Sequence, residues 1–422
     1  MNACKHHLIR SALVATLLAA APLALAGTAG TLAAPAAGDV VPSRLVAAPP
    51  PALAMEREPV QFAWALDPAQ AILAPAPFVA ESREYWQTIE ADELQRGYAI
   101  QTTAPGALVR ISPVAGSRGA GALRLEDFEL SIDGRRLSGA QAFADAADYE
   151  ALRATDASFP DGTMALRIDP VLGEGRFELR NRAAGGRLLV HVFEPGSPVS
   201  LTLADEGRPA LAGGRLQMEG RLLDAGQAVT ARRVGGLLTA PDGRSWDIDF
   251  DVASDGRILA GIDLPREASG VPGLWEVHAF AVHDRDGAQV LRDVRTAVAV
   301  AAPTARLAGG FRGDLSDGVR VGFEVETASE GRYEVRAVLH GTDASGRLVP
   351  AANAHAAAWL PAGGGTIELH VPAEVIAGGL RAPFQLRDVA LSDQGRLGRL
   401  EQRAQGPVIT APPVMRGRAG AR

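Results

Sequence analysis

Short segments of alternating apolar and polar residues, separated by Gly, Pro and Asp-Gly pairs, fill most of the chain. A period of two places successive side chains on opposite faces of a β-strand. Asp-Gly pairs at 242–243, 255–256 and 286–287 indicate hairpin turns, because glycine adopts the positive φ that tight turns need. This spacing predicts an immunoglobulin-like β-sandwich over residues 196–302. Its strands are expected near 199–204, 214–223, 234–240, 244–252, 257–264, 273–283 and 290–301.

A second series of short strands predicts another immunoglobulin-like sandwich, over residues 303–410. The two series share a motif, GLWEVHA at 273–279 and GRYEVRA at 331–337. In each motif an aromatic residue, Trp275 or Tyr333, begins an apolar face, so we predict that both rings are buried core anchors. The strands of this second sandwich are expected near 304–311, 319–327, 332–340, 347–350, 356–360, 365–371, 383–391 and 398–409.

The region from 57 to 195 is less regular and predicts a β-rich N-terminal domain with one or two short helices. The helix candidates are the amphipathic stretches 85–94 and 141–155. Residues 175–195 are expected to form a hairpin with Gly185-Gly186 at its tip. The expected fold is therefore mostly β, with tandem immunoglobulin-like β-sandwich modules preceded by this N-terminal domain.

The two ends of the chain differ from its body. Residues 1–26 combine a basic start, an apolar run of 16 residues and a small-x-small ending, which is typical of a cleavable secretory signal peptide. That run is shorter than the roughly 20 residues that span a bilayer, so no membrane insertion is expected after cleavage. We expect a semi-extended, Ala/Pro-rich linker at 27–56 and a disordered tail at 411–422. The protein is thus expected to be periplasmic or secreted.

Charge and cysteine content exclude several functional classes. The net charge is −7, and loss of Lys5 and Arg10 with the signal peptide would make it −9. An acidic chain of this kind is not expected to bind nucleic acid. Cys4 is the single cysteine and would leave with the signal peptide. Disulfides, cysteine-ligated zinc and cysteine catalysis are therefore excluded for the mature chain.

No catalytic or metal-binding motif emerges from the sequence. HExxH, GxSxG and GxxxxGK[ST] are absent, and no GxGxxG follows an expected strand. No two histidines of the mature chain are spaced i, i+2 or i, i+4. We therefore assign no catalytic, cofactor-binding or metal-binding residue and expect no cofactor. Among the tryptophans, only Trp246 and Trp359 are candidates for stacking on a sugar, and Trp246 alternates with apolar residues as a core residue would.

Clustered carboxylates are the remaining candidates for chemistry. Asp247, Asp249 and Asp251 alternate along one face of the strand expected at 244–252. The solvated outer face of a sandwich accounts for this pattern. Calcium binding and catalysis by paired carboxylates, as in all-β glycoside hydrolases, stay open as alternatives. Asp284 and Asp286, at a hairpin tip, are a weaker calcium candidate.

The mature region resembles a family of exported proteobacterial proteins known as a domain of unknown function. Its later modules look like bacterial immunoglobulin-like or macroglobulin-like β-sandwiches. This resemblance implies an exported β protein of several modules and assigns neither an activity nor site residues. The segments that carry it are REPVQFAWALD (57–67), ELQRGYAIQTTAPGALVRISP (93–113), VHVFEPGSPVSL (190–201), GLWEVHAFAV (273–282), PTARLAGGF (303–311) and APFQLRDVAL (382–391).

Two functional classes follow from these observations. The first is an exported, non-enzymatic binding or structural protein of the bacterial envelope or exterior. Its partner would be a protein or a glycan, held by end loops or module junctions. The second is a secreted hydrolase, or an accessory module, acting on polysaccharide or peptide. Carboxylates clustered in a cleft would favour the hydrolase, whereas a flat, solvated acidic strand would favour the binding protein. The sequence leaves the oligomeric state open.

Overall fold

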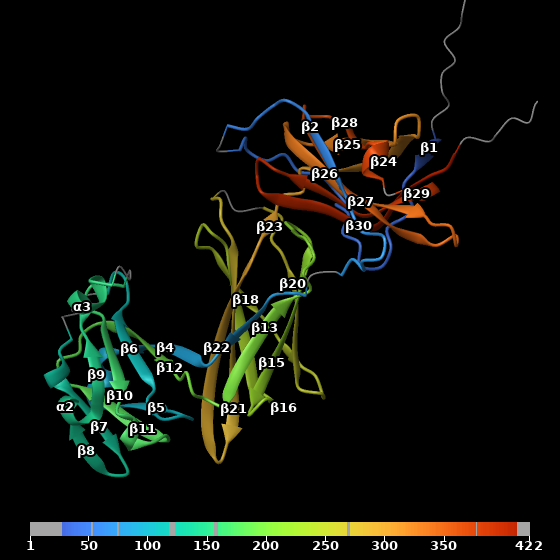
Figure 1. Cartoon of the computed structure of the whole chain (residues 1–422). Coiled ribbons are helices and arrows are strands. Elements are labelled where there is room, and N and C mark those ends of the chain that lie inside the picture. Colours follow the sequence, from blue (N-terminus) through green and yellow to red (C-terminus); the bar gives the residue numbers. More distant parts are fainter. Residues whose placement is uncertain are drawn as a thin grey trace, which may run out of the picture.

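The computed structural model describes residues 28–411, except 52–53, 74–75, 118–122, 156–158, 268–270 and 377. The expected signal peptide and the tail beyond residue 411 lie outside the described residues. Three β-rich domains follow one another in space (Figure 1). The described chain contains strands β1 to β30 and three short α-helices, which confirms the prediction of a mostly β fold with tandem sandwiches. None of the described helices is long and apolar enough to cross a membrane.

The second domain is a sandwich of two antiparallel sheets, and most of its strands lie where the spacing predicted them; the exceptions are the predicted strand 244–252, which is divided between the two sheets, and a strand at 79–82, a segment that was expected in the N-terminal domain. All three Asp-Gly pairs form hairpin turns, with the φ angles of their glycines between 79° and 85°. One sheet has the order β19 (Asp251–Val252), β20 (Arg257–Asp263), β15 (Arg215–Asp224), β13 (Val199–Asp205) and β3 (Val79–Ser82), with β16 (Gln227–Val229) beside β15. The other has the order β18 (Ser245–Ile248), β17 (Arg233–Thr239), β21 (Trp275–Arg285) and β22 (Ala288–Val298). Two short strands, β14 (Ala210–Leu211) and β23 (Val300–Ala301), pair in parallel.

The third domain repeats this arrangement. In both sandwiches the first, second and fifth long strands share one sheet, and the third, fourth, sixth and seventh share the other. One sheet of the third domain has the order β1 (Thr28–Thr31), β24 (Ala305–Asp314), β25 (Val319–Thr327) and β28 (Gly365–Val371). The other has the order β2 (Val60–Ala65), β27 (Leu348–Leu360), β26 (Gly331–Thr342), β29 (Arg381–Asp393) and β30 (Gly398–Ile409). A 3-10 turn, Ala373–Val375, follows β28.

The two aromatic anchors lie on central strands of their sandwiches, Trp275 on the sixth long strand of the second domain and Tyr333 on the third long strand of the third domain. Trp275 lies on β21 and Tyr333 on β26, each a strand with neighbours on both sides. Their exposed fractions are 2% and 0%, so both are buried, as the repeated motif predicted. Trp275 stacks on Trp246 with ring centroids 5.6 Å apart, and the Tyr333 hydroxyl donates to the Ser329 carbonyl at 2.7 Å. Trp246 therefore packs in the core of the second domain.

The N-terminal domain packs two sheets around a core that includes Phe128 and Phe177, both fully buried. Its first sheet contains β4 (Glu84–Glu90), β12 (Arg187–Phe193), β6 (Leu108–Pro113), β10 (Met164–Ile168) and β9 (Phe143–Ala147), in that order. The second has the order β5 (Tyr98–Gln101), β11 (Arg176–Asn181), β7 (Phe128–Ile132) and β8 (Arg135–Ser138). The helices are α1 (Ala91–Arg96), α2 (Gly139–Ala142) and α3 (Tyr149–Arg153), with 3-10 turns at Leu125–Asp127 and Pro170–Leu172.

Three expectations for this domain are wrong in detail. The stretch 85–94 is mostly strand β4, because its buried residues Tyr85 and Ile89 are four apart, a spacing that suits a strand as well as a helix. The stretch 141–155 is divided among α2, β9 and α3. Residues 175–195 form no hairpin, because β11 and β12 belong to different sheets and Gly185-Gly186 lies on the connection between those sheets.

The expected linker at 27–56 is instead part of the third domain, and so is the start of the expected N-terminal domain at 57. Strand β1 pairs with β24, and β2 pairs with β27 at the opposite edge of the other sheet. Between them the chain follows the third domain, held by backbone contacts such as the bridge between Val40 and Gln402. Arginines of the third domain also donate to its carbonyls, Arg332 to Glu56 at 2.6 Å and Arg396 to Pro49 at 2.9 Å. Backbone pairing of this kind needs no apolar periodicity, so the sequence pattern did not reveal it.

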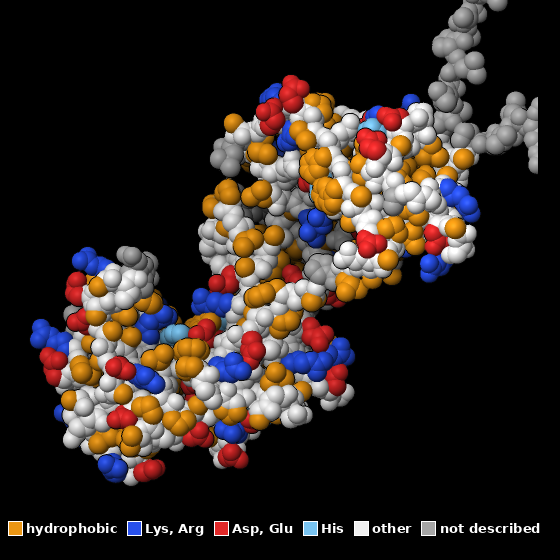
Figure 2. Space-filling model, in the orientation of Figure 1, with side chains coloured by type: hydrophobic (Ala, Val, Ile, Leu, Met, Phe, Trp, Pro, Cys, Tyr) orange, Lys and Arg blue, Asp and Glu red, His pale blue; other side chains and the backbone are white. Residues whose placement is uncertain are grey.

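The N-terminal and second domains share one sheet and a buried ion pair. Strand β22 meets β4 through the pair Asp293 and Glu84, which makes a continuous sheet of nine strands. Beside this seam, Arg292 and Glu194 form an ion pair of 2.6 Å between side chains that are both 0% exposed. Arg292 Nε also donates to the Val199 carbonyl at 2.9 Å. Between the two domains the surface is hollowed (Figure 2).

Candidate functional site

The acidic strand predicted at 244–252 does not exist as one strand. Asp247 lies on β18 and Asp251 on β19, and these strands belong to different sheets, with Asp249 between them. The chain passes from one sheet to the other here while Ile248 stays buried. All three carboxylates are exposed, and none lines the hollows described below. The structure therefore does not bring them together in a cleft.

The other candidates from the sequence are also dispersed. Asp284 pairs with Arg232 at 3.2 Å, and Asp286 occupies a turn position with φ of 52°. The guanidinium of Arg57 lies over the ring of Trp359, 4.3 Å from the ring centroid. Within the described ranges, no group of three His, Cys, Asp or Glu side chains is arranged to hold a metal ion.

The side chains that do converge lie on the outer face of the five-stranded sheet in the third domain. Cross-strand pairing places Trp64 of β2 opposite Asn353 of β27, and Phe62 opposite His355. The same rows continue onto the next strands. We call this surface the aromatic–polar face and define it by Phe62, Trp64, Arg336, Asn353, His355, Arg387, Gln402 and Gln405.

Three rings form a cluster at one edge of this face. The ring centroids of Phe62, Trp64 and His355 lie 5.1–5.7 Å apart, and their planes are within 24° of parallel. Phe62 and Trp64 are 51% and 43% exposed and stack on each other, so they form a contiguous exposed apolar patch of the kind that marks binding surfaces. The cluster therefore offers apolar contact surface to a ligand.

A carboxylate holds the third ring of this cluster in place. Nδ1 of His355 donates to Oε1 of Glu334 at 2.7 Å, and the other oxygen of Glu334 accepts from Gln394 at 3.2 Å. This arrangement fixes the ring orientation and leaves Nε2 of a neutral His355 as an acceptor.

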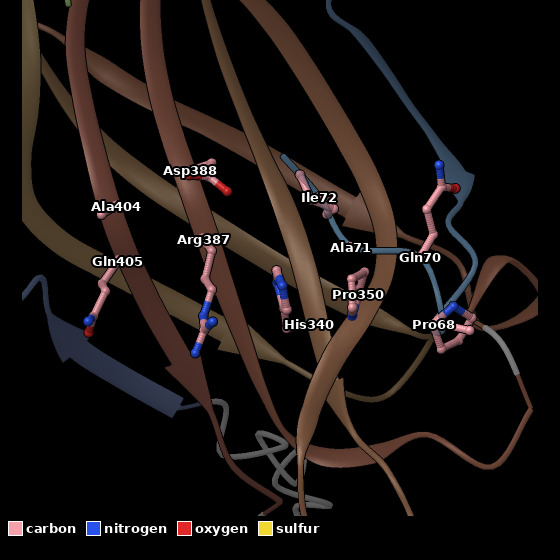
Figure 3. A pocket seen from close by; sticks show the side chains of 11 residues that line it. Pro68, Gln70, Ala71, Ile72, His340, Pro350, Arg387, Asp388, Ala404 and Gln405 are labelled. Carbon is pink, nitrogen blue, oxygen red and sulfur yellow. The ribbon is translucent and has the colours of Figure 1, made fainter. Parts of the chain in front are cut away.

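A hollow of about 540 Å³ lies beside the ring cluster on the same sheet. Figure 3 shows His340, Arg387 and Gln405 on adjacent strands, with the segment 68–72 on the side of His340 that faces away from Arg387. Burial lowers the pKa of His340, which is only 7% exposed, and the nearby Arg387 acts in the same direction. The lining residues are Pro68, Ala69, Gln70, Ala71, Ile72, His340, Pro350, Arg387, Asp388, Ala404 and Gln405.

The chemistry of this hollow favours binding over catalysis. Its lining contains one carboxylate, Asp388, whereas glycoside hydrolysis generally uses two. A second hollow of about 380 Å³, next to Trp359, also has a single carboxylate, Glu330. Neither hollow thus offers the pair of acidic groups that the hydrolase alternative requires.

Sequence reasoning missed the aromatic–polar face because it assigned residues 57–67 to the N-terminal domain. The signal was nevertheless present. With period two, Val60, Phe62 and Trp64 share one face of a strand, and all three are exposed. The sequence did not show that this strand pairs with β27, which lies far along the chain.

Comparisons with solved structures place the fold. A DUF4785 family protein from Legionella pneumophila subsp. pneumophila strain Philadelphia 1 matches with a TM-score of 0.64 and 20% identity, covering 84% of this chain and 94% of that one. Trypsin-activated alpha-2-macroglobulin from Escherichia coli (16% identity, 71% of this chain, 22% of that one) and a tetra-tandem repeat from the extending region of a large adhesion protein (12% identity, 78% and 74%) both have TM-scores of 0.19, too low to support any argument.

Comparisons by sequence agree with the Legionella match. The search of curated proteins gave no match. Two family models match, both described as domains of unknown function. The N-terminal domain of DUF4785 matches residues 51–194, and its C-terminal domain matches residues 304–409. The chain therefore carries both the N-terminal and the C-terminal domain of the DUF4785 family.

Proposed function

We propose that the protein is an exported, non-enzymatic binding protein of the bacterial envelope or exterior, and that its third domain binds a glycan on the aromatic–polar face. The observation that carries the proposal is the exposed ring cluster beside amide and guanidinium side chains on one open sheet.

The chemistry of the face matches that of a sugar. A pyranose ring presents C–H bonds on its faces and hydroxyl groups around its rim. Phe62 and Trp64 offer ring surface to the C–H bonds. Asn353, Arg387 and Gln405 offer donors and acceptors to the hydroxyls. A docked protein would instead be expected to meet a more apolar core around the rings.

Export and module type belong to the same proposal. The basic start, apolar run and small-x-small ending of residues 1–26 support a cleaved signal peptide. The strand order of the second and third domains supports immunoglobulin-like modules, because such modules divide their strands between two sheets in the same way. N-terminal sequencing of the native protein should begin near Gly27, and an intact Met1 would contradict export.

The binding test uses residues 27–422, a glycan array and calorimetry on the strongest hit. We expect Trp64→Ala and Phe62→Ala to weaken binding about tenfold or more, which corresponds to about 1.4 kcal/mol each. The matched control is Phe78→Ala, which removes a ring that is 76% exposed outside this face. Absence of glycan binding, or equal affinities for all three variants, would contradict the proposal.

The same preparation tests the hydrolase alternative. Incubation with peptidoglycan, common polysaccharides and casein should give no turnover. Turnover that disappears in Asp247→Asn or Asp249→Asn would replace the binding proposal with a hydrolase.

A further inference from the structure

The hollow between the N-terminal and second domains contains a second cluster of charged and aromatic side chains (Figure 2). It lies on the outer face of the continuous nine-stranded sheet, at the seam of β22 and β4. The aromatic–polar face of the third domain contributes nothing to it, so the inference below is independent of glycan binding.

Trp86 of β4 is the centre of this cluster. The ring of His278 stacks on it with centroids 4.6 Å apart, and the guanidinium of Arg295 lies 4.1 Å from its centroid. The backbone N–H of Trp86 donates to Oδ2 of Asp293 at 2.7 Å. Asp293 also lies 3.3 Å from Nε2 of His278. Side chains of the second domain therefore hold Trp86 of the N-terminal domain.

Glu84, the carboxylate that the N-terminal domain contributes to this cluster, already accepts a hydrogen bond. Glu84 Oε2 accepts from Nε2 of His191 at 2.8 Å. This hydrogen bond lowers the pKa of Glu84, so the group is ionised at neutral pH. The ring of His191 also meets Trp86 edge-on, with centroids 6.0 Å apart.

Arg110 is the member of the cluster whose charge is not matched. It lies on β6 directly opposite His191 and is partly buried, with its guanidinium 4.9 Å from the ring centroid of Phe159. No carboxylate among the described residues lies within 4 Å of it, and its buried Nε has no hydrogen-bond partner. Burial lowers the pKa of Arg110, with Arg295 acting in the same direction and Glu84 opposing both.

A partly desolvated cation without a paired anion is unfavourable unless something supplies the missing charge. A guanidinium presents its donors in a planar fork that matches the two oxygens of a carboxylate. Arg295, on the far side of Trp86, is paired with Glu276 at 3.5 Å, so Arg110 is the arginine of this cluster that has no ion-pair partner among the described residues. We propose that this hollow binds a carboxylate-bearing ligand, with Arg110 as the residue that receives the carboxylate.

The experiment is calorimetric titration of residues 27–422 at constant ionic strength. The probes are succinate, D-glucuronate and the dipeptide Ala-Ala, with phosphate and chloride as comparisons. We expect saturable binding of at least one carboxylate probe, and the preferred probe distinguishes a simple acid, an acidic sugar and a peptide terminus. Arg110→Gln should weaken that binding at least tenfold.

The matched control is Arg167→Gln, on the neighbouring strand β10, which removes an exposed arginine that pairs with Asp145 at 3.6 Å. It should bind as the wild type does. If Arg110→Gln fails to fold by circular dichroism, Arg295→Gln takes its place and should weaken binding at least threefold. The proposal is overturned by absence of binding of all three carboxylates, by equal or stronger binding of phosphate, or by equal losses in the variant and its control.

Discussion

The second domain meets its two neighbours in different ways. Toward the N-terminal domain it extends its sheet through β22 and β4 and buries the ion pair of Arg292 with Glu194. Toward the third domain, no strand pairing or ion pair between described residues crosses the junction. There the chain crosses between the domains twice, between β2 and β3 and again near Pro303, where Ala301 packs against the core of the third domain. We infer that the first two domains form one cooperative unit and that the third is a separate one.

The buried ion pair gives the largest expected effect. Arg292→Ala would leave Glu194 buried without its partner, which typically costs about 3–5 kcal/mol. Urea denaturation should show this loss in the unfolding of the first two domains. Arg285→Ala is the control, because its ion pair with Asp224 is about a quarter exposed and should contribute no more than about 1 kcal/mol. Equal losses in the two variants would contradict the comparison.

Removal of the Trp275 ring tests whether the two domains unfold together. Trp275→Ala should cost about 3–5 kcal/mol, the usual range for a large buried aromatic residue. In differential scanning calorimetry the N-terminal domain should melt with the second domain at a lower temperature, while the third-domain transition stays in place. A change within about 0.5 kcal/mol would show that the ring is not a core anchor.

The third domain allows a milder, complementary change. Tyr333→Phe removes only the hydroxyl that donates to Ser329, for an expected loss of about 0.5–1.5 kcal/mol. Calorimetry should show a shift in the third-domain transition alone. A shift of both transitions would mean that the junction near Pro303 couples the domains.

The smallest expected effect is a pH dependence at the seam. The hydrogen bond from His191 lowers the pKa of Glu84 below its ordinary value of 4.5 in the folded state. The stability that this provides is complete above the ordinary pKa and is lost as the pH falls through the lowered one. Because Glu84 is a third exposed, the contribution should not exceed about 1 kcal/mol. The difference in unfolding free energy between the wild type and Glu84→Gln should shrink between pH 5 and pH 3, and a constant difference would contradict the assignment.

The parts of the fold that the sequence predicted are those with local patterns. The hairpins at Asp242-Gly243 and Asp286-Gly287 join strands that are adjacent in sequence, so turn chemistry and alternation were sufficient. The spacing of Tyr85 and Ile89 suits both a helix and a strand. The pairing of β4 with β12 makes this segment a strand. The ring cluster depended on β2 meeting β27, a contact for which the sequence holds no local signal.

Residues 28–65 complete a domain whose other strands are synthesised last. A ribosome produces β1 and β2 well before their partners β24 and β27. During synthesis β1 and β2 therefore stay unpaired, while the other two domains can already fold. The two ends finally meet, and Thr28 Oγ1 donates to the carbonyl of Thr410, 382 residues away, at 3.3 Å. Closing so long a loop carries a large entropic cost, so formation of the third domain should be the slow step of folding. Partly made chains would lack this domain altogether, and any ligand held by its outer sheet would be bound by finished molecules alone.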